Sequence, residues 1–69
     1  SYLNIMIELL AQLEDHANFK YDGHYTIFRF TTNFKVFFGT ITERDEIDKI
    51  QGYTTLKSAI VNCLLNEGL

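Results

Sequence analysis

The spacing of the apolar residues changes along this chain, and that change constrains the fold more than any other feature. From Tyr2 to about Asp15, apolar residues recur every three or four positions, which predicts a helix. From about Asn18 to Ile41 they alternate, which predicts strands. Helical spacing then returns. The sequence therefore predicts one small α+β domain covering residues 1–69.

The predicted first helix has an unusually wide apolar arc. Ser1 is placed to cap its start. A helix that is apolar over most of its girth is buried on several sides, and in so short a chain a second subunit would supply the extra cover. We therefore expect a homodimer. Two adjoining stripes form the arc: Leu3, Met6, Leu10 and Leu13, and beside them Tyr2, Ile5 and Leu9.

The middle of the chain predicts a three-stranded antiparallel meander. Asp22-Gly23 favours a two-residue hairpin loop, because glycine takes a positive φ at no cost. A three-residue loop is predicted at residues 31–33, with Asn33 in the left-handed conformation. The strands would then lie near residues 18–21, 24–31 and 34–41.

Loop lengths decide which side chains share a face of this sheet. With these two loops the inner face would hold Phe19, Tyr21, His24, Thr26, Phe28, Phe30, Phe34, Val36 and Phe38. The opposite face would hold Tyr25, Ile27, Arg29, Lys35 and Phe37, flanked by Lys20 and Ile41. A two-residue second loop would instead mix Lys35 into the aromatic face. We prefer the three-residue loop because it separates the apolar residues better.

A short helix is predicted over residues 43–51. A capping box that begins at Thr42 would start it, Ile47 and Ile50 would point inward, and Gly52 would end it.

A final amphipathic helix is predicted to follow, capped by Thr54 or Thr55 and ended at Gly68 with a contact from Leu69. Its apolar residues follow the helical spacing that an amphipathic helix needs: Leu56, Ala59, Ile60, Cys63 and Leu64. The predicted order is therefore α-β-β-β-(short α)-α, with the helices packed on one face of the sheet.

This order and length resemble the topology of the double-stranded RNA-binding domain. The resemblance implies a lysine cluster at the start of the last helix, where that family contacts RNA phosphates. The matching stretch here is Gly52-Tyr53-Thr54-Thr55-Leu56-Lys57-Ser58, which contains one lysine. Because phosphate neutralisation drives such binding, the resemblance extends to topology and not to RNA contact.

Composition and chemistry favour a binding protein over an enzyme. Six basic against nine acidic residues give a net charge of −3, whereas nucleic-acid binders usually carry a basic excess. Cys63 with His16 or His24 is the only nucleophile–base pair, and Cys63 lies on an apolar helix face, where cysteine usually packs. We expect no catalysis, no metal and no cofactor. A single cysteine and no apparent signal peptide or membrane span predict a cytoplasmic location.

The outer sheet face is the predicted partner-binding site. Tyr25, Ile27, Arg29, Lys35 and Phe37 would interleave aromatic and basic groups on an uncovered surface, which is typical of an interface. The plainer alternative is that these residues only support strand formation. A secondary acidic patch for a basic partner is Glu43, Asp45, Glu46 and Asp48, which would equally suit the first turn of a helix.

The sequence thus predicts a protein-binding module: a small inhibitor, adaptor or regulatory protein. Small proteins of phage or mobile-element origin, including inhibitors of host defence nucleases, often have this character. One alternative is single-stranded nucleic-acid binding, with bases stacked on Tyr25 and Phe37 beside Arg29 and Lys35. Another is a homo-oligomer whose aromatic face is the subunit contact.

Overall fold

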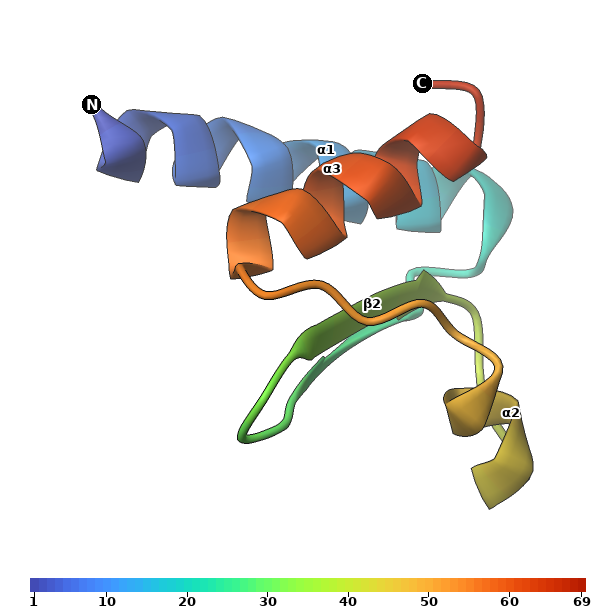
Figure 1. The fold of residues 1–69 in the computed structure, drawn as a ribbon. Coiled ribbons are helices and arrows are strands. Elements are labelled where there is room, and N and C mark those ends of the chain that lie inside the picture. Colours follow the sequence, from blue (N-terminus) through green and yellow to red (C-terminus); the bar gives the residue numbers. More distant parts are fainter.

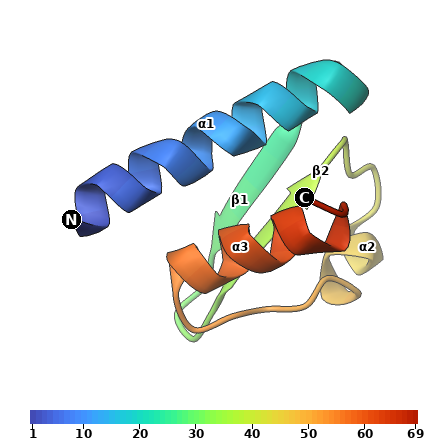
Figure 2. The same cartoon turned by 90° about the horizontal axis from the view of Figure 1, so that it is seen from above.

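A computed structural model describes all 69 residues. The elements are α1 (Tyr2–Lys20), β1 (Tyr25–Arg29), β2 (Phe34–Phe38), α2 (Arg44–Asp48) and α3 (Leu56–Asn66). Figure 1 shows α1 and α3 in one layer above the two-stranded sheet, with α2 on the other side. Viewed from above, α1 runs beside β1 and α3 lies over β2 (Figure 2). The α+β class is confirmed. The sheet has two strands, so the predicted three-stranded meander is wrong in one strand.

The segment predicted as the first strand is the last turn of α1. The helix continues through Lys20, and the N–H groups of Tyr21 and Gly23 both donate to the carbonyl of Ala17, at 2.8 and 2.9 Å. Asp22 and Gly23 have φ values of 57° and 82°, so they end the helix instead of turning a hairpin. Ala17 is fully buried, and its packing stabilises the extra helical turn.

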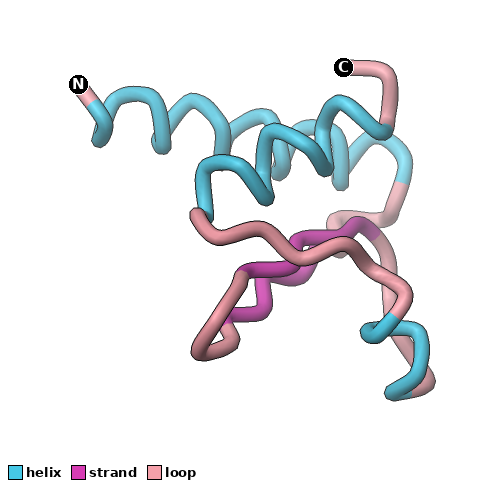
Figure 3. Tube along the Cα trace, in the orientation of Figure 1, coloured by secondary structure: helices cyan, strands magenta, loops and turns pink.

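The two strands form a hairpin with a shorter turn than predicted. The N–H of Phe30 donates to the carbonyl of Asn33 at 2.8 Å, which leaves Thr31 and Thr32 as a two-residue loop. Asn33 does not take the predicted left-handed conformation. In the resulting register Ile27 pairs with Val36. β1 is shorter than predicted at both ends, whereas β2 begins at Phe34 as predicted and ends early, at Phe38. Figure 3 shows how much of the chain around them is loop.

The core lies between the two long helices and the sheet. Leu13 of α1 and Ile60 of α3 are fully buried, and Val36 is the buried residue of β2. The predicted apolar face of α3 is confirmed, since Ala59, Ile60 and Leu64 are buried while Leu56 and Cys63 pack against the core cluster.

The helix caps are confirmed in part. The Ser1 hydroxyl accepts from the N–H of Asn4, and that of Thr55 accepts from the N–H of Ser58, so Thr55 and not Thr54 is the cap. Gly68, with φ 84°, follows the end of α3 as predicted. The capping box of α2 begins one residue later than predicted, at Glu43, and the helix ends at Asp48 instead of continuing to residue 51.

Candidate functional site

The register reverses β1 relative to the predicted face. Tyr25 and Ile27 lie opposite Phe38 and Val36, so they face the helices and pack against the core cluster. Their predicted place on the outer face is therefore wrong. The physical reason is the two-residue turn, because a one-residue change in register moves every side chain of a strand to the other face.

Arg29 also lies on the helix-facing side, at the exposed end of β1. Its guanidinium carbon is 5.4 Å from the centre of the Phe34 ring, a cation–π distance. The predicted interleaving of Arg29 with the outer aromatic residues is thus also wrong.

Lys35 and Phe37 do lie on the outer face, as predicted for β2. Their neighbours there are Thr26, Phe28 and Phe30, which were predicted to lie on the inner face. We call these five side chains the outer face. Knowing that the loop is only Thr31-Thr32 would have placed these three residues on the outer face. Those two positions hold none of the Gly, Asn or Asp residues that mark two-residue turns, so the sequence did not reveal the loop length.

The aromatic rings of the outer face form one cluster. The Phe28 ring centre lies 5.7 Å from that of Phe37 and 5.8 Å from that of Phe30, and both pairs are tilted. The Lys35 ammonium lies 5.6 Å from the centre of the Phe30 ring. It also donates to the carbonyl of Ile47 at 2.9 Å, so it anchors α2 beside the sheet.

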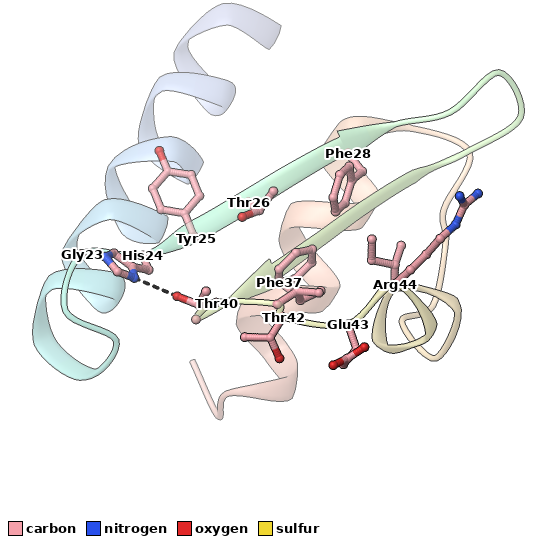
Figure 4. Close-up of a pocket in the computed structure, with 13 residues that line it drawn as sticks. Gly23, His24, Tyr25, Thr26, Phe28, Phe37, Thr40, Thr42, Glu43 and Arg44 are labelled. Atoms are coloured by element: carbon pink, nitrogen blue, oxygen red, sulfur yellow. Dashed lines mark hydrogen bonds between the residues drawn. The ribbon is translucent and has the colours of Figure 1, made fainter.

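An open groove of about 510 Å³ runs between this cluster and the segment that leads into α2. Phe28 and Phe37 form its floor, as Figure 4 shows. Its remaining lining is mainly polar and includes Thr26, Thr40, Thr42, Glu43 and Arg44. The volume falls in the range of about 300–1,000 Å³ that is typical of ligand pockets.

The polar rim of the groove is fixed by local hydrogen bonds. His24 Nδ1 lies 2.9 Å from the Thr40 hydroxyl, which closes the end of the groove nearest the start of β1 (Figure 4). The Glu46 carboxylate accepts from the N–H groups of Glu43 and Thr42 at 2.8 and 3.0 Å. These two bonds lower the pKa of Glu46, that from Glu43 most.

The predicted acidic patch lies on and just before α2. Asp45, Glu46 and Asp48 belong to the helix and Glu43 is its N-cap. The Glu46 carboxylate accepts the capping hydrogen bonds, and Asp45 lies in the first turn, where negative charge complements the helix dipole. This arrangement agrees with the plainer of the two interpretations of the patch.

A second polar cluster, which was not predicted from the sequence, joins the ends of α1 and α3. The Glu67 carboxylate lies 2.8 Å from both His16 Nε2 and the Tyr21 hydroxyl. The hydrogen bond to Glu67 raises the pKa of Tyr21. Glu67 is 51 residues from His16 and 46 from Tyr21, so only the fold brings this carboxylate to the other two side chains. Their geometry serves to hold the two helix ends.

Cys63 lies on the half-buried side of α3, beside a shallow opening that Phe38 and Glu67 also line. Burial, and secondarily the charge of Glu67, raises the pKa of this thiol to about 11. A thiol of that pKa is almost entirely protonated at neutral pH, which is typical of a packing cysteine and not of a nucleophile.

None of the helices combines the length and hydrophobicity that crossing a membrane requires. Comparison with protein-family models, with curated proteins and with solved structures finds no match for this chain.

Proposed function

We propose that this chain is a non-catalytic protein-binding module, an inhibitor, adaptor or regulatory protein, that contacts its partner through the outer face. The observation that carries the proposal is the aromatic cluster of Phe28, Phe30 and Phe37. It lies on the side of the sheet that neither α1 nor α3 covers, and it floors an open groove. Uncovered apolar patches beside polar rims are typical of interaction sites.

The shape of the surface favours a protein over a small molecule. The aromatic cluster continues past the groove to Phe30, a residue that is 42% exposed, so the apolar surface is wider than the groove itself. A partner could insert one large apolar side chain between Phe28 and the groove wall, and hydrogen-bond the hydroxyls of Thr26 and Thr42 at the rim. Buried aromatic anchors with a polar rim are where protein interfaces concentrate binding energy.

Nucleic-acid binding is less well supported than the sequence alone suggested. Two cations were expected beside the aromatic face. Arg29 lies on the opposite side of the sheet, and Lys35 already donates a hydrogen bond to the Ile47 carbonyl. The net charge of −3 also opposes the phosphate contacts that provide most of such affinity.

A homodimer is the second candidate, and the exposed N-terminal part of α1 favours it. Tyr2 and Leu3 are 62% and 66% exposed, and Ile5 and Ile7 are also exposed. Light scattering at two protein concentrations tests this alternative, since a dimer of this kind would dissociate on dilution. A cytoplasmic location, in which Cys63 stays reduced, is part of the proposal.

The test is capture of a partner by the immobilised protein from extracts of its native source. Phe28→Ala/Phe37→Ala should lose the captured protein, because both changes remove the floor of the groove. Phe19→Ala is the matched control, since Phe19 is 84% exposed on α1, away from the outer face. Circular dichroism checks that each variant is folded.

Loss of capture with the double variant and retention with Phe19→Ala supports the outer face as the site. Capture that is unchanged by the double variant contradicts the proposal. Capture that is lost equally with Phe19→Ala would place the contact on α1 and also contradict it.

A further inference from the structure

The main-chain groups along the free edge of β1 have no partner within the chain. Hydrogen bonds join Gly39 to His24 and Phe30 to Asn33, so the bonded positions of β1 are the even-numbered ones. The N–H and C=O groups of Tyr25, Ile27 and Arg29 therefore point away from β2. No side chain or loop hydrogen-bonds to them. An extended backbone is the structure that matches three such pairs in a row.

The opposite edge of the sheet is treated differently. There the N–H of Phe34 donates to the carbonyl of Tyr53 at 2.7 Å, and the N–H of Tyr53 donates back at 2.9 Å. The segment that leads into α3 thus covers the start of the β2 edge. Two-stranded sheets are marginally stable, and the β1 edge is the one left open for a third strand.

The first helix adds an apolar surface above this open edge. In the view from above, the N-terminal half of α1 lies beside β1, on the side away from β2 (Figure 2). Leu3, Ile7 and Leu10 follow the i, i+4, i+7 spacing of one stripe, on the other side of α1 from His16, which contacts α3. Leu3 is 66% and Ile7 56% exposed, and Leu10 is half-buried.

We infer that the β1 edge is a binding site for an extended peptide segment of another protein, which adds to the sheet as a third strand. Its main chain would pair with Tyr25, Ile27 and Arg29. Alternate side chains, on the side that faces α1, would be apolar and pack against Leu3 and Leu10. Main-chain hydrogen bonds with pockets for alternate side chains are how strand addition works. This site is separate from the outer face, and either can exist without the other.

The residues around the β1 edge indicate which side chains the bound peptide segment should carry. Arg29 is exposed and is the charged side chain of β1, so a carboxylate opposite it would form a favourable cross-strand pair. A second copy of this chain fits less well. If two β1 strands paired about a two-fold axis, the two α1 helices, which both lie beyond that edge, would meet in the same space.

The test uses a displayed library of random nine-residue peptides, selected on the whole protein. Binding of the enriched peptides is measured by fluorescence polarisation. Arg29→Pro removes one outward N–H without breaking the bonds to β2, and it should weaken binding at least tenfold. Arg29→Ala, which keeps that N–H, should weaken binding much less.

Amide hydrogen exchange gives a readout that does not depend on any variant. In the free protein the amides of Tyr25, Ile27 and Arg29 should exchange fast and those of Thr26 and Phe28 slowly. A bound peptide should slow the first three. Enriched peptides with alternating apolar residues that slow these amides support the proposal. The absence of enriched peptides, peptides that leave these amides unprotected, or protection that rises with concentration of the protein alone would each overturn it.

Discussion

The Tyr21 hydroxyl lies 2.8 Å from each oxygen of the Glu67 carboxylate, and this contact joins the residue after α1 to the residue after α3. His16 hydrogen-bonds the same carboxylate at 2.8 Å, and the Lys20 ammonium lies 3.6 Å from it. The Tyr21 ring stacks on Phe38, with ring centres 5.1 Å apart. The cluster therefore ties the ends of both long helices to the end of β2.

Replacing Glu67 with glutamine should flatten the loss of stability in acid. The hydrogen bond with His16, followed by that with Tyr21, lowers the pKa of Glu67 below its ordinary value of 4.5. The folded state therefore holds this carboxylate ionised to lower pH than the unfolded chain does. Its contribution to the free energy of unfolding is complete above about pH 4.5 and is lost as the pH falls through the folded pKa. Urea denaturation from about pH 3 to pH 6 measures the difference between wild type and Glu67→Gln.

Glu46 also has a lowered pKa, so the wild type will lose some stability in acid for that reason too. Both proteins keep Glu46, and the comparison isolates Glu67. Tyr21→Phe keeps the ring and removes one hydrogen bond, and it should give an intermediate acid slope. Parallel curves for wild type and Glu67→Gln would show that the ionised Glu67 carboxylate does not stabilise the fold.

Gly52→Ala should destabilise the protein, because Gly52 lies directly against Asn33. A Cβ atom at position 52 would be 2.5 Å from Oδ1 of Asn33, an atom that is buried without a hydrogen-bond partner. Overpacking of this kind costs about 1–3 kcal/mol. Adding Asn33→Ala should recover part of the loss, since the nearest remaining atom, the Cβ of residue 33, is 3.2 Å away. Strictly additive effects in urea denaturation would contradict this account.

The sequence predicted the fold well where a local pattern is compatible with a single structure. The apolar spacing from Leu56 to Leu64 placed the buried face of α3, and Ser1 capped α1 as expected. Asp22-Gly23 has two meanings, because positive φ residues serve a hairpin and a helix end equally. Burial of Ala17 decided for the helix, and that burial is not visible in a local pattern.

The candidate site was predicted for one strand and missed for the other. The outward positions of Lys35 and Phe37 follow from the packing of Val36 in the core. The outward positions of Thr26 and Phe28 depend on the length of the turn between the strands. Neither Thr31 nor Thr32 has a positive φ, and neither is a residue type that specifies a turn of one length. The sequence was therefore equally compatible with a register that places the opposite set of β1 side chains outward.

Cys63 should react slowly with thiol reagents in the folded protein. Its pKa of about 11 compares with an ordinary value of 9.0, a difference that reduces the thiolate fraction near pH 8 by about two powers of ten. The rate of reaction with Ellman's reagent should fall by about that factor relative to the urea-unfolded chain. Equal rates in the two states would show that the thiol is neither buried nor influenced by Glu67.

Truncation on the outer face should cost far less stability than truncation in the core. Leu13 is fully buried, and Leu13→Ala should lose about 2–5 kcal/mol, which is a large share of the roughly 3–10 kcal/mol that a chain of this length possesses. Phe30→Ala should lose only about 1 kcal/mol, because Phe30 is 42% exposed and its main contacts are Phe28 and Lys35 on the same open face. Urea denaturation of both variants makes the comparison. A cost for Phe30→Ala equal to that for Leu13→Ala would show that the outer face belongs to the core.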